Sequence, residues 1–316
     1  MSGLGVETVQ TAGVSAGVVG PGVIGAAAIA APLTGWRQRL HVLLRARHPD
    51  MVQVTDIATR ETTLRVAVRS FLVVVAFWWS TTGVVFALER NPTTRLLGLV
   101  VASALALWGA SLVYLERDRD TPSAVRRSFL GGAFLWTWAQ VTFYGAWIIG
   151  PEAMRLHIPA EPPSWGFAVR AVLSMFWYQL VMLGVLATTA IITHQRANRV
   201  GWWTAALFWC VHQIASINIF LGVENSGRGF FPEPLVFLES YFGPPVNSWF
   251  LPFTIACVIA YTLYTALFAI RGRTPGYRQA MMLLTVIGTL SVLELAVLGA
   301  PIQLPLWEAF LAVRGY

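Results

Sequence analysis

Long apolar segments alternate with short polar connections along most of this chain. Seven such segments cover residues 66–88, 96–115, 128–150, 167–193, 202–221, 249–270 and 279–300. Each is long enough to cross a hydrocarbon core of about 30 Å, because an α-helix rises about 1.5 Å per residue. The pattern therefore predicts an all-α fold: a polytopic membrane bundle of about seven transmembrane helices.

The ends of the chain differ from these spans in composition. We expect an N-terminal extension at residues 1–65, a transmembrane domain at 66–308 and a short tail at 309–316. Residues 11–35 are uncharged but contain six glycines and two prolines, which favours a flexible tail. Their length also allows an additional span.

Residues 36–47 have the pattern of a basic amphipathic helix. One helical face carries Trp36, Leu40, Leu43 and Leu44, and another carries Arg37, His41 and Arg45. A helix with one apolar and one basic face is suited to lying on a membrane surface. We expect it to bind anionic lipids of the cytoplasmic leaflet.

Arginine placement predicts the orientation in the membrane. Fifteen arginines fall in residues 1–65 and in the connections 116–127, 194–201 and 271–278, against five on the opposite side. Cytoplasmic segments carry an excess of basic residues. The N-terminus is therefore predicted to be cytoplasmic, whereas the C-terminus and the long connection 222–248 face the periplasm. A bacterial inner membrane is the expected location.

Composition agrees with a membrane protein and excludes several other classes. The chain is 56% hydrophobic and 12% charged, a balance that soluble domains seldom reach. Its net charge of +7 favours lipid headgroups over nucleic acid, because no soluble basic module is present. The two cysteines, Cys210 and Cys257, lie in apolar spans without metal-ligand spacing. P-loop, nucleophile-elbow and dinucleotide motifs are absent, so we expect neither a metal site nor catalytic residues.

Six polar residues stand out within the spans, where polar groups are costly and are often functional. They are Gln140, Arg170, Gln179, His212, Ser216 and Glu294. Gln140, Gln179 and His212 lie about halfway along three different spans, which predicts a neutral polar layer that links those helices. Glu294 lies deep enough to need a partner, so we predict an ion pair with Arg170. The alternative is a protonated Glu294 that donates to a backbone carbonyl.

The connection 222–248 is predicted to hold a short amphipathic helix. Pro234 suits its first turn, and Leu235, Leu238 and Phe242 repeat at i, i+3 and i+7. Such a helix is expected to lie in the membrane interface and to expose aromatic side chains that bind a partner. The candidate partner-binding residues are Asn218, Phe220, Gly222, Asn225, Phe230, Phe231, Pro232, Glu233, Leu238, Tyr241 and Phe242. A packed connecting loop without any role in recognition is the alternative.

Several segments resemble one known family, the PuhE photosynthetic complex assembly proteins of anoxygenic phototrophic bacteria. Phe77-Trp78-Trp79-Ser80-Thr81-Thr82-Gly83 is similar to that family's W-W-x-S-T-G segment. Residues 218–225 resemble its N-x-F-L-G-V-x-N motif, and residues 230–242 resemble the aromatic segment that follows. Leu293-Glu294 in the last span also fits. The resemblance covers about residues 70–308.

The resemblance implies a non-catalytic role in assembling or stabilising a reaction centre and its light-harvesting ring, with those subunits as partners. In that family the third and fourth spans each carry a His-Glu pair. Here the matching positions are Ala139-Gln140 and Tyr178-Gln179. Amides neither titrate nor bind hard cations strongly, which favours a structural role with no cofactor. The alternatives are a pigment- or quinone-handling enzyme, a bacteriochlorophyll-binding protein that uses His212, and a transporter.

Overall fold

The computed structural model describes residues 63–77, 88, 92–156, 164–229 and 231–301. All of them belong to one compact unit, residues 60–316. The predicted amphipathic helix at 36–47, most of the N-terminal extension, Phe230 and the C-terminal tail lie outside the described residues.

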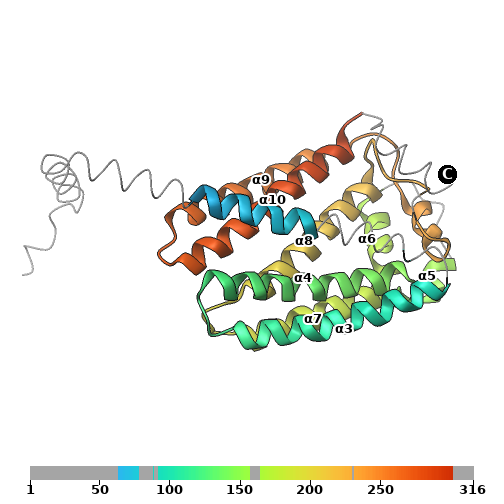
Figure 1. Cartoon of the computed structure of the whole chain (residues 1–316). Helices are drawn as coiled ribbons and strands as arrows, with labels where there is room; N and C mark the ends of the chain where they lie inside the picture. The colour runs from blue at the N-terminus through green and yellow to red at the C-terminus, as the bar shows by residue number, and fades with distance from the viewer. Residues whose placement is uncertain (1–62, 78–87, 89–91, 157–163, 230, 302–316) are drawn as a thin grey trace, which may run out of the picture. The chain divides into compact units, whose positions relative to one another are not determined.

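The described residues form helices and no strand, so the predicted all-α class is confirmed. A first helix covers residues 63–77. It is followed by α3 (Pro92–Glu116), α4 (Pro122–Tyr144), α5 (Glu152–Leu156), α6 (Trp165–Ser174), α7 (Phe176–Thr193), α8 (Val200–Leu221), the 3₁₀ helix η2 (Glu233–Tyr241), α9 (Phe250–Arg271) and α10 (Pro275–Gly299). Figure 1 shows the long helices side by side, with the short helices α5 and α6 near one end of the bundle.

Five of the described helices are long and apolar enough to cross a membrane: α3, α7, α8, α9 and α10. This set indicates a multi-pass membrane protein. The α4 helix has 23 residues but is not in the set. The count of seven spans remains a prediction, because the first predicted span is described only in part.

The fourth predicted span, residues 167–193, is not one helix but two. The α6 and α7 helices meet at Met175. The Tyr178 N–H donates to the Ile149 carbonyl at 3.1 Å, so a neighbouring connection supplies a backbone partner at the break. Gly150 fits against the same break, where a Cβ atom would come 2.9 Å from the Phe176 nitrogen. The prediction of a continuous helix is wrong because this partner comes from another part of the chain.

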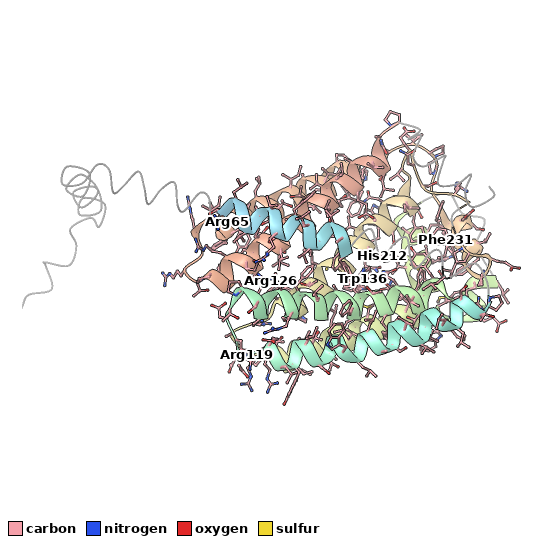
Figure 2. All side chains as sticks on the ribbon, in the orientation of Figure 1. Arg65, Arg119, Arg126, Trp136, His212 and Phe231 are labelled. Atoms are coloured by element: carbon pink, nitrogen blue, oxygen red, sulfur yellow. The ribbon has the colours of Figure 1, made fainter. Side chains whose placement is uncertain are left out.

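The three connections predicted to share the arginine-rich side do lie together. Arg196 pairs with Asp118 at 3.1 Å, and the Asn198 N–H donates to the Arg117 carbonyl at 2.8 Å. The third connection packs against the first, because a Cβ atom on Gly276 would come 2.7 Å from the Asp120 carbonyl carbon. Figure 2 shows Arg119 and Arg126 at this end of the bundle and Phe231 at the opposite end, with Trp136 and His212 between them. We call this end, formed by residues 117–121, 194–199 and 272–278 together with the adjoining turns of the first helix, α3, α4 and α9, the arginine-rich end. Its cytoplasmic location remains a prediction.

The α4 helix lies at the centre of the bundle, with fifteen buried residues, and packs against α3, α7, α8 and α10. Glycines allow the closest of these approaches. A Cβ atom on Gly109 of α3 would come 2.7 Å from the Gly131 carbonyl oxygen, and one on Gly132 would come 2.8 Å from the Gly201 carbonyl carbon of α8. Small residues at helix crossings are typical of membrane bundles, because they let the backbones touch.

Candidate functional site

The connection 222–248, called the cap below, folds onto the end of the bundle opposite the arginine-rich end. Its helix η2 is a 3₁₀ helix, and Pro234 is in its first turn as predicted. Leu235, Leu238 and Tyr241 are the buried residues of this helix. Their spacing of three matches the 3.0 residues per turn of a 3₁₀ helix. The predicted α-helical stripe that ends at Phe242 is therefore wrong in its periodicity, although Phe242 is also buried.

The aromatic side chains of the cap face the protein. Tyr241 is 2% exposed, and its ring lies 5.0 Å from that of Phe167 in α6. Its hydroxyl donates to the Met154 carbonyl at 3.1 Å. Phe242 contacts both Phe220 of α8 and Phe231. The expectation that these aromatics are exposed is thus wrong for Tyr241 and Phe242, because the apolar face of the cap covers the bundle itself.

Two asparagines fasten the cap to the end of α10. The Asn225 side chain donates to the Val297 carbonyl at 2.8 Å and also to the Ala300 carbonyl, and its N–H donates to Leu298 at 2.9 Å. Asn247 donates to the Gly299 carbonyl at 2.7 Å. The last carbonyls of a helix lack intrahelical partners. Asn225 and Asn247 therefore complete the hydrogen bonding of α10.

The cap begins at Gly222, where the backbone passes close to a later part of the cap. Gly222 has φ 122°, a conformation that favours glycine. A Cβ atom there would come 2.8 Å from the Val246 carbonyl oxygen. One turn earlier, Asn218 is buried in α8 and donates to Thr254 of α9 at 3.0 Å. Asn218 and Gly222 therefore have structural roles within the chain. The part of η2 that remains exposed for contact with a partner includes Glu233 and Val236.

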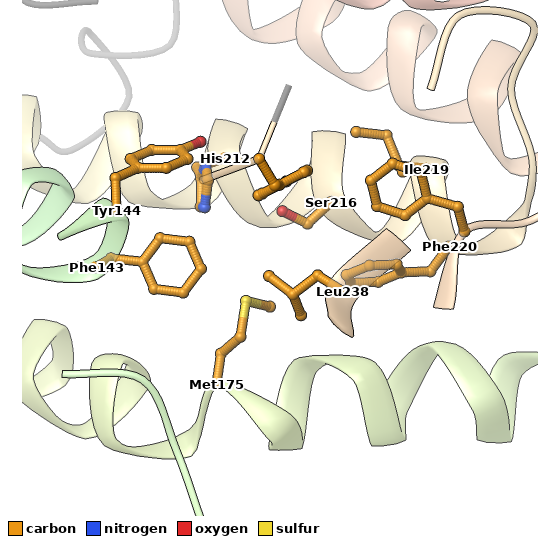
Figure 3. Close-up of a pocket in the computed structure, with 10 residues that line it drawn as sticks. Phe143, Tyr144, Met175, His212, Ser216, Ile219, Phe220 and Leu238 are labelled. Atoms are coloured by element: carbon orange, nitrogen blue, oxygen red, sulfur yellow. The ribbon is translucent and has the colours of Figure 1, made fainter. Parts of the chain in front are cut away.

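A small cavity lies beneath the cap. Its volume is about 30 Å³. Figure 3 shows His212 and Ser216 of α8, Tyr144 of α4 and Met175 of the α6–α7 break around it. Its lining consists of Phe143, Tyr144, Met175, His212, Ser216, Ile219, Phe220, Phe231, Leu238 and Phe242. The cavity has room for about two or three water molecules, since a single water needs roughly 10–15 Å³.

His212 is held by aromatic rings. Trp136 lies edge-on at 5.5 Å between ring centroids, and Tyr178 lies at 6.0 Å. Among the described residues His212 makes no hydrogen bond. The described residues also contain no group of three or more metal-ligating side chains. His212 therefore packs against aromatic rings and forms part of the cavity wall.

The predicted polar layer forms as two separate networks. Gln140 of α4 donates to the Tyr178 hydroxyl of α7 at 3.3 Å. Gln179 donates to Gln213 of α8 at 2.9 Å and accepts from the Trp209 indole at 3.0 Å. Tyr178 and Gln179 are consecutive on a helix, so their side chains point about 100° apart. The two networks together link α4, α7 and α8, but Gln140 and Gln179 do not share one network. His212, the third residue of the predicted layer, has no hydrogen bond among the described residues.

The predicted Arg170–Glu294 ion pair is not formed between these two described residues. Arg170 lies exposed on α6, and its positive charge acts on Tyr241. Burial raises the pKa of Tyr241, and Arg170 partly offsets that effect. Glu294 lies within electrostatic range of Tyr144 instead. The pairing failed as a prediction because it assumed a continuous fourth span, whereas α6 packs beside η2 and α8.

Sequence reasoning missed a buried carboxylate at the arginine-rich end. Glu116 is 5% exposed and pairs with Arg127 at 2.6 Å and with Arg119 at 3.6 Å. Asn198 donates to the Glu116 carbonyl at 3.1 Å and joins a second connection to the same point. The signal was a lone acidic residue at the end of an apolar run, beside several arginines. Glu116 therefore organises this end of the bundle.

Comparison with known proteins gives the family. The family model described as "Protein of unknown function (DUF3623)" matches residues 65–314. The chain belongs to the DUF3623 family. One relative, the "Uncharacterized 30.4 kDa protein in puhA 5'region" of Rhodobacter capsulatus, is 26% identical over 228 residues, which are 71% of this chain and 82% of the relative. No solved structure matches this DUF3623 chain.

Proposed function

We propose that this DUF3623 protein is a non-catalytic membrane accessory factor, which assembles or stabilises a photosynthetic reaction-centre and light-harvesting complex. The observation that carries the proposal is the relative described as a protein in the puhA 5' region. The resemblance of residues 218–242 to the PuhE assembly proteins supports the same role. The protein would act in the inner membrane of a phototrophic bacterium with its N-terminus in the cytoplasm.

The geometry beneath the cap supports a structural role over pigment or quinone chemistry. The cavity beside His212 measures about 30 Å³, whereas pockets for drug-sized ligands span roughly 300–1,000 Å³. Gln140 and Gln179 already have hydrogen-bond partners within the bundle. The polar side chains near the midpoint of the spans are therefore used to hold helices together, which favours a structural role over binding a pigment or acting on a substrate.

Exposed apolar side chains on two elements support a proposal for where partner subunits bind. Large apolar side chains line the outside of α9, where Phe253 is 54% and Leu263 is 65% exposed. At the cap, Val236 is 47% exposed on the face of η2 opposite the buried leucines. We propose that partner subunits pack on α9 within the membrane and on η2 outside it. The basic helix at residues 36–47 would add binding to anionic lipids.

The test uses a phototrophic host whose own gene has been deleted. Absorption spectra of its membranes measure the reaction centre and the antenna, and mass spectrometry of a tagged chain identifies co-purifying subunits. Deletion should lower the amount of complex, and the wild-type gene should restore it. Unchanged spectra after deletion would refute the role in assembly. Stoichiometric pigment on the purified chain would favour the pigment-handling alternative.

A surface variant tests the cap. Val236→Glu places a charge on the exposed face of η2 without changing Leu235 or Leu238. If the cap binds a partner, this variant should accumulate normally while the complex declines. Arg273→Glu, at the arginine-rich end, is the control and should leave the complex intact. Normal complex levels with Val236→Glu would exclude η2 as the docking surface.

A further inference from the structure

Three helices meet in a polar contact at the arginine-rich end. Gln279 of α10 is 1% exposed, and its amide nitrogen donates to the Ser70 hydroxyl of the first helix at 2.7 Å. The amide oxygen of Gln279 accepts from the Arg126 guanidinium of α4 at 3.4 Å. Ser70 itself is fully buried. This contact fixes the Arg126 side chain at the boundary between the first helix and α4.

Positive charge exceeds negative charge at this end by a wide margin. Its carboxylates among the described residues are Glu116, Asp118 and Asp120, of which the first two form ion pairs with arginines. The described arginines of this end number eleven: Arg65, Arg69, Arg117, Arg119, Arg126, Arg127, Arg196, Arg199, Arg271, Arg273 and Arg278. The carboxylates therefore neutralise only part of the charge.

The excess charge is concentrated around Arg126. Arg69 directly precedes Ser70, which Gln279 joins to Arg126, so both arginines lie at this boundary. The positive charges of Arg69 and Arg127 both act on the Arg126 guanidinium. Its side-chain hydrogen bond among the described residues goes to a neutral amide. Arg127 is paired with Glu116, whereas no described carboxylate forms an ion pair with Arg69. Like charges held close together in this way are stabilised when an anion lies between them.

Two helix N-termini add to the positive charge at the arginine-rich end. The α4 helix begins at Pro122 and the α10 helix at Pro275, and both helix N-termini lie at the arginine-rich end. Neither helix has an acidic residue in its first turn. A helix N-terminus carries about half a positive charge. Two such ends beside Arg69 and Arg126 make this boundary favourable for a negatively charged group.

The surroundings of Arg69 identify the kind of anion. On the first helix, Arg69 is flanked by exposed apolar side chains: Leu64 at 65%, Val68 at 50%, Phe71 at 50% and Leu72 at 61%. An anion bound here would have apolar surface directly beside it. A phospholipid has both parts, because its phosphate carries the charge and its acyl chains cover apolar surface. Basic pockets between helix ends on the cytoplasmic side are known to suit such headgroups.

We propose that Arg69 and Arg126 bind the phosphate of an anionic phospholipid at the boundary between the first helix and α4. The guanidinium groups would donate paired hydrogen bonds to the phosphate oxygens, a geometry that arginine provides and lysine does not. Gln279 acts as a positioning residue, since it orients Arg126. The acyl chains would lie along the exposed face of the first helix. This site is separate from the basic helix at residues 36–47.

The test uses the full chain, purified in neutral detergent, stripped of lipid and titrated with phosphatidylglycerol. Native mass spectrometry counts the bound lipids. Arg69→Gln with Arg126→Gln should weaken binding about 30-fold, from about a fivefold loss for each arginine near an anionic headgroup. Arg271→Gln with Arg273→Gln removes two exposed arginines from the same end and is the matched control. The control pair should bind as the wild type does.

Further comparisons keep the proposal falsifiable if the glutamine pair does not fold. Arg69→Lys with Arg126→Lys keeps both charges and should bind more weakly than the wild type, because the paired geometry is lost. Binding equal to the wild type in the lysine pair would overturn the proposed geometry. If the Arg69/Arg126 and Arg271/Arg273 double variants lose lipid binding equally, binding depends on the overall positive charge of this end, and the proposed site is overturned. Competition by millimolar inorganic phosphate as effective as the lipid itself would overturn the lipid assignment.

Discussion

Replacing Gly132 by alanine tests whether the bundle depends on the backbone contact between α4 and α8. The new Cβ would lie 2.8 Å from the Gly201 carbonyl carbon and 3.0 Å from its Cα, whereas ordinary contact begins at 3.4 Å. The Gly201 carbonyl oxygen would lie closer still, so the two helices must separate by more than the 0.6 Å that the carbonyl carbon alone requires, which is the difference between 3.4 and 2.8 Å. Because α4 also packs against α3, α7 and α10, it cannot move away freely.

Overpacking of this kind costs about 1–3 kcal/mol, and we expect the upper end because the obstructing atoms are backbone. Gly184→Ala on α7 is the matched control, since nothing lies within 4 Å of its Cβ position. That change should be neutral or stabilising by up to about 1 kcal/mol, from helix propensity alone. Unfolding of the purified chain in mixed micelles, followed by tryptophan fluorescence, measures both. Equal stability of the two variants would refute the close-packing argument.

Three further substitutions probe the cap and the arginine-rich end. Tyr241→Phe removes the hydrogen bond to the Met154 carbonyl and should lower the unfolding free energy by about 1 kcal/mol, whereas no change in a denaturant titration would contradict that contact. Asn225→Ala leaves carbonyls of α10 without their donor and should speed proteolysis of the cap while the remaining helices stay protected; an unchanged cleavage rate would count against it. Glu116→Gln should destabilise the chain by about 1–2 kcal/mol, which is less than for a fully buried ion pair because Arg127 is half exposed. If the ion pair is the cause, high salt should reduce the difference in unfolding free energy between the variant and the wild type.

The apolar runs located most of the long helices to within a few residues, but the segment predicted at 128–150 forms a helix at Pro122–Tyr144, six residues earlier at each end. The segment predicted at 202–221 forms a helix at Val200–Leu221, and the one at 249–270 forms a helix at Phe250–Arg271. Span length depends on local hydrophobicity, which a single sequence contains in full. The break at Met175 could not be seen, because its replacement partner is the Ile149 carbonyl, 29 residues earlier than Tyr178. No proline within residues 167–193 marks the interruption.

The cap shows a second limit of sequence reasoning. Periodicity correctly indicated that Leu235 and Leu238 share an apolar face, and both are buried. It could not say whether that face covers lipid, a partner or the bundle of the same chain. That choice depends on distant groups, such as the Met154 carbonyl that accepts from Tyr241. Likewise, the sequence identifies the polar residues of the spans. Which of them pair depends on how each helix is rotated about its own axis, and the sequence does not give that rotation.

The attachment of the cap to α10 sets an order of events during synthesis. Asn225 donates to carbonyls 72 and 75 residues further along the chain. The cap therefore reaches its final hydrogen bonding only after the ribosome has made the last helix and that helix has entered the bilayer. A chain that stops early, or whose last helix fails to insert, leaves the Asn225 and Asn247 side chains of the cap without the carbonyls that they bind. The closed cap thus marks a chain whose biogenesis is complete.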